Sequence, residues 1–565
     1  MTGRTGQRHL RRAGAWLALA VSGGVAFSAV AQAAAPGAAD TVIWGGLVYT
    51  AETGQPTAQA VAVRAGRIVF VGDRAGAAAL VGPATRTIDL KGAALFPGFT
   101  DSHVHLDGVG ERELTLNLEG STSAAEVAAR VKARVATSRP GELIFGRGWI
   151  ETGWPEKRFL QASDIDAVAP DNPVILERAD GHAMTANTAA LRLAGISEAT
   201  PVPFGGAINR DPQGHLTGML VDNAMSLLDK VRPVETAEHR VQALKVGMAV
   251  ENRHGWTGVH FMSAPWGDVM ALEALAARGE APLRVYAAVD REDVDKLFAS
   301  GPRSAGDGRI VTRAIKLYAD GALGSRGAAL WAPYSDDGAN TGLFRFKDDD
   351  TRAVLADAAA HGIQVCTHAI GDRANSRVLD LYAEALPKAG PDRRWRIEHA
   401  QIIRAADIPR FAQLGVVASM QPSHAIGDLH FAGARLGQDR LGDAYPWQSL
   451  LQAGAVIAGG SDAPVERGDP LIEFYGAVAR KDLKGQSGPG WHPEQALSRE
   501  AALRLFTSAA AYARFAEKDL GTIAVGKRAD LTAFSVDLMT AREADILKGH
   551  AVLTMVDGQV VWQAP

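Results

Sequence analysis

Eight short apolar runs, each followed by a loop and a segment with helical periodicity, occupy most of this chain and constrain its fold more than any other feature. Strands that alternate with helices in this way are typical of βαβ units and a parallel sheet. Eight such units are the number that closes a (β/α)8 barrel. The sequence therefore predicts an α/β fold with a TIM-type barrel over residues 95–510. The eight runs are Leu95–His105, Thr257–Met262, Leu283–Val289, Ile310–Tyr318, Ile363–Ala369, Arg396–Gln401, Val416–Gln421 and Val456–Ser461.

The first barrel run is separated from the second by about 150 residues, far more than a crossover helix needs. We therefore expect an insertion after the first barrel strand, over about residues 107–249, that forms a subdomain at the barrel mouth.

Both ends of the chain carry short β-type runs separated by turns rich in glycine. The termini of a compact domain often lie close together, so strands from both ends can pair in one sheet. We therefore predict a composite β-sandwich built from residues 41–94 and 511–565. Its expected strands are Thr41–Ile43, Leu47–Thr50, Ala60–Val63 and Arg67–Val71 at one end, and Thr522–Val525, Leu531–Phe534, Ala551–Val556 and Gln559–Trp562 at the other.

The first 33 residues are typical of a bacterial signal peptide. Four arginines precede a weakly apolar run over residues 13–30, and the small residues at 31–33 offer a cleavage site. The run is too rich in glycine and serine for a permanent membrane span, and no later stretch has the ~18 uninterrupted apolar residues of one. The sequence thus predicts a periplasmic or secreted protein with no stable membrane span after cleavage. Adjacent Arg11 and Arg12 raise the twin-arginine route, and the ordinary Sec route stays open.

The charge pattern excludes nucleic acid as a partner. The chain has 59 Lys and Arg against 63 Asp and Glu, a net charge of −4, and the two signs are interspersed. Binding to a phosphate backbone needs a basic stripe that releases counterions, and none is present. The expected partner is a small-molecule substrate, and the sequence leaves open whether the chain forms a homo-oligomer.

Five of the eight barrel runs end in side chains that can hold a metal, and the active site of such a barrel lies at the carboxyl ends of its strands. His103 and His105 at the end of the first run are spaced i, i+2, so both imidazoles face the same side of a strand. Four histidines and a carboxylate exceed the three protein ligands of a mononuclear catalytic zinc, which favours a two-metal site. The candidate ligands are His103, His105, Lys316, His368, His399 and Asp462.

Each candidate also has an ordinary alternative role. Lys316 can pair with Asp320, the histidines can cap loops, and Asp462 can be the N-cap of a helix. Convergence of all six on one rim of a barrel favours the metal site. Imidazole and carboxylate suit zinc, manganese and iron; we expect two zinc ions per chain, with manganese or iron as alternatives.

Six motifs occur in an order that resembles a known family. They are Leu95–Leu106, Lys316–Ser325, His368–Ala374, Arg396–Gln401, Gly460–Glu466 and Gly521–Leu531. On these motifs the sequence resembles the amidohydrolase superfamily, specifically the branch of N-substituted formamide deformylase and YtcJ-like metal-dependent hydrolases. The resemblance covers nearly the whole mature chain.

The resemblance implies a distorted (β/α)8 barrel with a β-sandwich from both chain ends. It also implies metal at the four strand-end histidines, a carboxylated Lys316 that bridges two ions, and Asp462 as ligand and proton shuttle. The expected reaction is hydrolysis of an amide-type carbon–nitrogen bond, in a linear N-acyl or formamide compound or in a cyclic amide. An esterase or lactonase of the same fold, and a non-catalytic metal-containing binder of small molecules, are the alternatives.

Two further histidines are candidates for substrate contact. His182 stands in a motif of the inserted region that resembles a substrate loop of the branch, and His424 follows the seventh barrel run. A structural role in a loop is the alternative for both.

Overall fold

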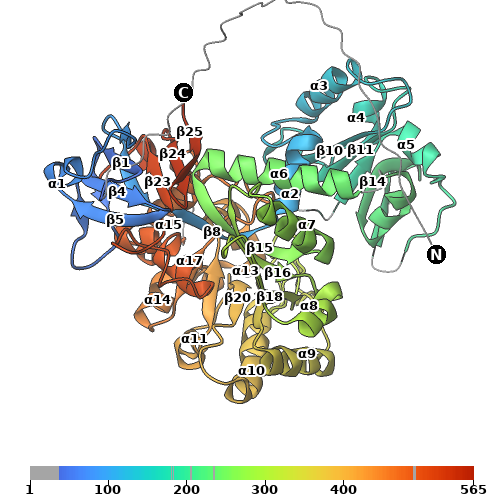
Figure 1. The fold of residues 1–565 in the computed structure, drawn as a ribbon. Coiled ribbons are helices and arrows are strands. Elements are labelled where there is room, and N and C mark those ends of the chain that lie inside the picture. The colour runs from blue at the N-terminus through green and yellow to red at the C-terminus, as the bar shows by residue number, and fades with distance from the viewer. Residues whose placement is uncertain (1–36, 180, 182, 204–205, 233–235, 488–490) are drawn as a thin grey trace, which may run out of the picture.

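The computed structural model describes residues 37–565 except 180, 182, 204–205, 233–235 and 488–490 (Figure 1). The predicted signal peptide over residues 1–33 lies outside the described residues. The predicted barrel is confirmed as a nearly closed sheet of eight parallel strands. Around the sheet they are β8 (Phe99–Val104), β15 (Trp256–Ala264), β16 (Arg284–Val289), β18 (Ile310–Tyr318), β19 (Gln364–Ala369), β20 (Arg396–His399), β21 (Val417–Met420) and β22 (Ile457–Gly459).

The barrel closes between β8 and the segment that follows β22. The backbone N–H of Asp462 donates to the carbonyl of His103 at 2.7 Å, and the N–H of His105 donates to the carbonyl of Ala463 at 2.8 Å. These two bonds place the end of the first strand directly beside the end of the last one. The histidines of the first run therefore meet the aspartate of the eighth run.

The side chain of Asp101 holds the same seam together. One of its oxygens, Oδ1, accepts from the backbone N–H groups of His103 at 3.0 Å and Ser461 at 2.9 Å, and the whole carboxylate is buried. Gly460 is required here, because a Cβ at this position would lie 2.4 Å from the backbone nitrogen of His103. The glycine thus permits the close approach that the seam needs.

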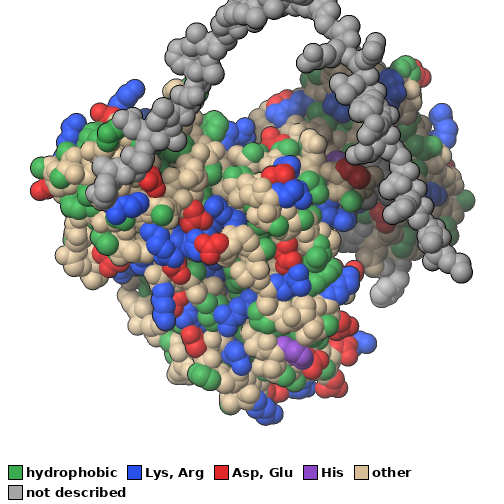
Figure 2. All heavy atoms as spheres, in the orientation of Figure 1, with side chains coloured by type: hydrophobic (Ala, Val, Ile, Leu, Met, Phe, Trp, Pro, Cys, Tyr) green, Lys and Arg blue, Asp and Glu red, His purple; other side chains and the backbone are tan. Residues whose placement is uncertain are grey.

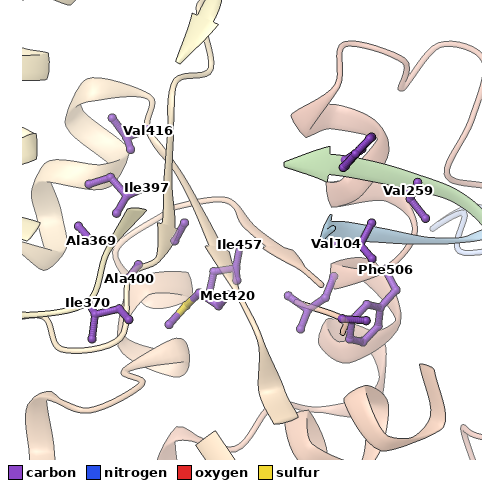
Figure 3. Packing of buried hydrophobic residues seen from close by; sticks show 14 of the residues in the cluster. Val104, Val259, Ala369, Ile370, Ile397, Ala400, Val416, Met420, Ile457 and Phe506 are labelled. Carbon is purple, nitrogen blue, oxygen red and sulfur yellow. The ribbon is translucent and has the colours of Figure 1, made fainter. Parts of the chain in front are cut away.

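Helices cover the outside of the barrel. Outward-facing apolar residues such as Val259, Ile397 and Ile457 belong to the large core cluster between strands and helices (Figure 3). The covering helices are α7 (Trp266–Ala277), α8 (Val294–Ser300), α9 (Asp348–His361), α10 (Asp372–Ala389), α11 (Ile408–Leu414), α14 (Trp447–Gln452), α16 (Arg499–Leu505) and α17 (Ser508–Ala513). Three further helices belong to the connections after β21 and β22: α12 (Pro422–Asp428), α13 (Ala432–Leu436) and α15 (Pro470–Ala479).

Strands from both chain ends form one mixed sheet, as predicted. The first predicted run is in fact two strands, because β7 (Ala94–Pro97) leaves the barrel and pairs antiparallel with β23 (Leu531–Phe534). The blue and red strands lie side by side in Figure 1. The mixed sheet also contains β2 (Val48–Tyr49), β3 (Thr57–Ala58), β24 (Ala551–Val556) and β25 (Gln559–Gln563), and a second sheet consists of β1 (Thr41–Trp44), β4 (Ala60–Arg64), β5 (Arg67–Gly72) and β6 (Arg86–Asp89).

The predicted strand Thr522–Val525 is wrong. This segment makes one backbone bond to the mixed sheet region, from Ile523 N to Thr50 O at 2.8 Å, and then one to the other sheet, from Gly526 N to Ile68 O at 2.8 Å. The segment passes from one sheet to the other, and no described strand pairs with it in a ladder.

Between β8 and β15 the chain forms a separate six-stranded sheet with its own apolar clusters. Two helices flank it, α2 (Leu106–Leu114) and α6 (Ala237–His254), and they pack against each other. The contact is close at Gly110 of α2, because a Cβ there would overlap the carbonyl oxygen of Ala243 on α6. In Figure 1 this subdomain lies at the far end of α6 from the sandwich. Its elements are β9 (Leu116–Asn117), β10 (Ile144–Trp149), β11 (Val174–Arg178), β12 (Ala183–Ala186), β13 (Gly206–Arg210), β14 (Leu216–Asp222), α3 (Ala124–Val135), α4 (Ala162–Asp166) and α5 (Thr188–Leu193).

Acidic and basic side chains are interspersed over the face seen in Figure 2. Among the helices of the described chain, none is long and apolar enough to cross a membrane.

A buried ion pair joins the barrel to the sandwich. The guanidinium of Arg284 on β16 bonds both carboxylate oxygens of Asp530, and it also contacts Asp557. Arg284 is 2% exposed and Asp530 is 7% exposed. Removing Arg284 would leave the buried carboxylate of Asp530 without its guanidinium partner, with only the backbone N–H of Asp557, among the described residues, still donating to it.

We expect Arg284→Ala to lower the free energy of unfolding by about 3–5 kcal/mol in urea titrations. The matched control is Arg352→Ala on α9, because Arg352 forms its ion pair with Glu384 at the surface. Loss of that exposed pair should cost less than about 1 kcal/mol. Equal losses in the two variants would contradict a structural role for the buried pair.

Candidate metal centre

His103 at the end of β8, His105 directly after it and an aspartate after β22 form the first group of possible ligands. The Nε2 atoms of His103 and His105 lie 3.5 and 3.3 Å from Oδ1 of Asp462. The ligand atoms of this group all lie within 4.8 Å of one another. The i, i+2 spacing of the histidines and the closed seam together produce this arrangement.

A second group shares the same aspartate. His399 Nδ1 and His424 Nε2 lie 3.9 and 3.5 Å from Oδ2 of Asp462, and these three side chains can also hold one ion. His424 was predicted as a substrate contact. Its Nε2 lies within this group of possible ligands, and the substrate contact stays a prediction. Its helix, α12, begins directly after β21 and turns the imidazole toward the seam.

Lys316 and His368 adjoin the two groups. The Nζ atom of Lys316 is buried and lies 3.2 Å from Nε2 of His103. The ring of His368 lies 4.7 Å from that of His399, and its Nε2 is 3.4 Å from Oδ1 of Asp320. Asp320 accepts backbone N–H groups of the neighbouring loops, from Ala329, Ile370 and Gly371. The alternative pairing of Lys316 with Asp320 is not present.

The strand ends that carry these groups have unusual backbone conformations. His399 and Asp462 have positive φ angles of 70° and 61°, as does Ala400 at 46°. Non-glycine residues rarely adopt such angles, and they are concentrated at functional sites. On β20 the alternation of a strand would point His399 to the same side as the outward-facing Ile397, and the left-handed turn redirects it into the barrel mouth. The alternative of Asp462 as a helix N-cap is not met, since no helix begins there.

A buried polar column beneath the centre orients His103. Its Nδ1 lies 2.6 Å from Glu398, which in turn pairs with Arg396 at 2.7 Å. Arg396 also donates to Nδ1 of His260 at 2.8 Å, and all four side chains are almost fully buried. A proton on Nδ1 of His103, held by Glu398, leaves the Nε2 lone pair free to bind a cation.

Burial and neighbouring charges set the protonation states of the possible metal ligands. Burial, together with the positive charge of Lys316, lowers the pKa of His103 to about 4. Burial acts against ionisation of Glu398 and Asp462, yet the cationic and imidazole groups around them hold the pKa of each carboxyl well below its usual range. Burial likewise lowers the pKa of His399 and of His424, so these two imidazoles and that of His103 favour the neutral form that binds a cation.

These residues fit a divalent metal. Asp462 Oδ1 and His424 Nε2 are buried atoms without a hydrogen-bond partner in the structure. Unpaired buried polar atoms are costly, and a cation between them removes that cost. His182, the other predicted substrate contact, lies outside the described residues.

Sequence reasoning did not identify Glu398 and Arg396 as functional. Both stand in a motif that was singled out for His399, and their alternate positions on β20 point them into the barrel. The alternation of side chains along the strand could have identified Arg396 and Glu398, because charged side chains that point into a barrel need buried polar partners.

The chain matches the amidohydrolase family model over residues 86–562. The chain belongs to the amidohydrolase family. It is 36% identical to the protein YtcJ of Bacillus subtilis (strain 168) over 92% of this chain and 99% of that one. It is 28% identical to N-substituted formamide deformylase of Arthrobacter pascens, over 92% and 97% of the two chains. The structure superimposes on that of an uncharacterized metal-dependent hydrolase from Pyrococcus horikoshii OT3 with a TM-score of 0.74 and 28% identity, covering 89% and 99% of the chains.

Membership in this amidohydrolase branch makes the protein a hydrolase of carbon–nitrogen bonds. Family and ligand geometry agree on a centre for a divalent metal at the closed seam of the barrel.

We expect Glu398→Gln to weaken divalent metal binding by about 10–100-fold, because a neutral amide no longer holds the Nδ1 proton of His103 as a carboxylate does. Competition with a fluorescent zinc chelator measures the affinity without any substrate. Glu384→Gln, at an exposed ion pair with Arg352, is the matched control and should bind metal as the unchanged protein does. Equal affinities in both variants would rule out the orienting role.

The pH dependence of stability tests the neutral state of His103. Its pKa is about 4 when folded and 6.5 when unfolded, so the unfolded chain binds more protons between these values. At pH 7 the side chain is neutral in both states, and as the pH falls from 6.5 toward 4 its burial increasingly destabilises the folded state. Relative to a His103→Asn variant, the metal-free protein should lose roughly 2–3 kcal/mol of unfolding free energy between pH 7 and pH 4.5. A pH-independent difference in urea titrations would contradict this.

Proposed function

We propose that the protein is an exported amidohydrolase that cleaves an amide-type carbon–nitrogen bond in a small N-acyl or formamide compound, or in a cyclic amide. The observation that carries the proposal is Asp462, which faces both groups of possible ligands through its two oxygens. The likeness to N-substituted formamide deformylase supports the linear class of substrate. We further propose two zinc ions per chain, with a carboxylated Lys316 between them.

Bound divalent ions would activate water and polarise the scissile carbonyl as Lewis acids. Asp462 accepts the proton of the attacking water and passes it to the leaving nitrogen as the carbon–nitrogen bond breaks. Its buried carboxylate is ionised before the reaction and so has a free site for that proton. We propose that an imidazole at His182 or His424 donates a hydrogen bond to the carbonyl oxygen as negative charge develops there.

Export is proposed from the N-terminal sequence. The arginines, the apolar run and the small residues at 31–33 have the order of a bacterial signal peptide. Edman sequencing of the protein from periplasm or culture medium tests this, and we expect a mature N-terminus directly after Ala33. Recovery of the intact N-terminus from the cytoplasm would contradict export.

Asp462→Asn should lower turnover by at least about 100-fold, because an amide cannot accept and return the proton. The assay follows amine release from a panel of N-alkylformamides, N-acyl amino acids and cyclic amides, beside matched esters. Asp349→Asn, at an exposed position of α9, is the control and should retain full activity.

Two outcomes would overturn parts of the proposal. An Asp462→Asn variant with most of its turnover would remove the proton-transfer role. Hydrolysis of the esters alone would replace the amide substrate with the esterase alternative.

A further inference from the structure

A cavity of about 300 Å³ lies on the outer side of β18, away from the metal centre. Residues alternate along β18, so Lys316 points into the barrel while Leu317 lines this cavity. The other walls come from β19, from α9 and α10, from the segment directly before α9, and from Arg291 after β16. Ligand cavities in proteins begin at about this size.

The floor of the cavity is apolar. It is formed by Leu317, Val354, Leu355, Val378 and Leu381, all buried.

The hydroxyl groups at the floor are already satisfied. Thr367 Oγ1 and Tyr382 Oη bond to each other at 2.7 Å, and Tyr382 also donates to the carbonyl of Arg396. Thr351 Oγ1 donates to the backbone carbonyl of Lys347. The floor therefore offers an occupant apolar contact with no polar partner.

The rim of the cavity is positively charged. Arg291, Arg345 and Lys347 line it with a single acid, Asp350, and within the described chain none of these four forms an ion pair. Arg345 instead lies over the ring of Tyr318, with 5.1 Å between guanidinium carbon and ring centroid.

Two acids of the first turn of α9 are engaged elsewhere. Asp348 pairs with Arg377, and Asp349 pairs with Arg352. The rim thus keeps an excess of cationic groups above an apolar floor.

We infer that this cavity is a binding site for a small amphipathic anion, with a carboxylate at the cationic rim and an aliphatic chain on the apolar floor. Guanidinium and ammonium groups bind carboxylates through charge-assisted hydrogen bonds, and the chain gains the burial of its methylene groups. The inference is independent of the reaction proposed above.

The site adjoins the metal centre through one side chain. Tyr318 lines the cavity, and its ring lies 5.1 Å from Nζ of Lys316 and 6.0 Å from the ring of His368. A bound anion therefore contacts the wall that separates the cavity from the centre.

Octanoate is the probe, and isothermal titration of the full chain measures its binding. The protein is first stripped of metal, so that the carboxylate cannot bind at the centre. We expect one octanoate per chain, and no comparable binding of acetate, which lacks the chain, or of octylammonium, which has the opposite charge.

Two variants separate this cavity from other sites. Arg345→Ala removes a rim cation at an exposed position and should weaken octanoate binding at least tenfold, whereas Arg352→Ala on the outer side of α9 should not. Val354→Phe fills the floor and leaves the rim intact, and should abolish binding. The inference is overturned if octanoate fails to bind at millimolar concentration, binds no better than octylammonium, or binds the Arg345→Ala variant as tightly as the unchanged protein.

Discussion

The closure of the barrel between its first and last strands is the constraint on which the candidate centre depends. His103 belongs to β8 and His105 follows it directly, whereas Asp462 follows β22, more than 350 residues later. Two backbone bonds and the buried carboxylate of Asp101 hold these segments in contact. An open sheet would leave the histidines and the aspartate apart, so the ligand group exists only where the seam is closed.

Below the centre the barrel interior combines two kinds of packing. Met262, Tyr286, Ala288, Ala314 and Cys366 form a small apolar cluster inside the barrel. The column of His260, Arg396, Glu398 and His103 runs beside it, with charged groups that have almost no contact with water. Burial of such groups costs several kcal/mol and is tolerated only with good mutual hydrogen bonds. The column therefore provides orientation of His103 more than stability.

The sequence predicted the barrel and the strand-end residues because both depend on local patterns. Apolar runs mark the strands, and the residue at each carboxyl end lies on the functional rim whatever the details of packing. Glu398 could not be assigned a partner in this way, since His103 lies 295 residues away and only the closed barrel brings it near. The position of His424 among the possible metal ligands depends on how α12 packs after β21. Sequence periodicity does not predict that packing. The segment Thr522–Val525 has strand composition but lacks a neighbouring strand.

The proposed reaction needs a divalent metal centre at the barrel seam, and metal content tests for that centre most directly. Inductively coupled plasma mass spectrometry on the purified protein, with a His103→Asn, His105→Asn variant as reference, gives the number of ions per chain. The account predicts about two divalent ions in the protein and a clear loss in the variant. No bound metal after reconstitution, or equal content in the two proteins, would contradict it.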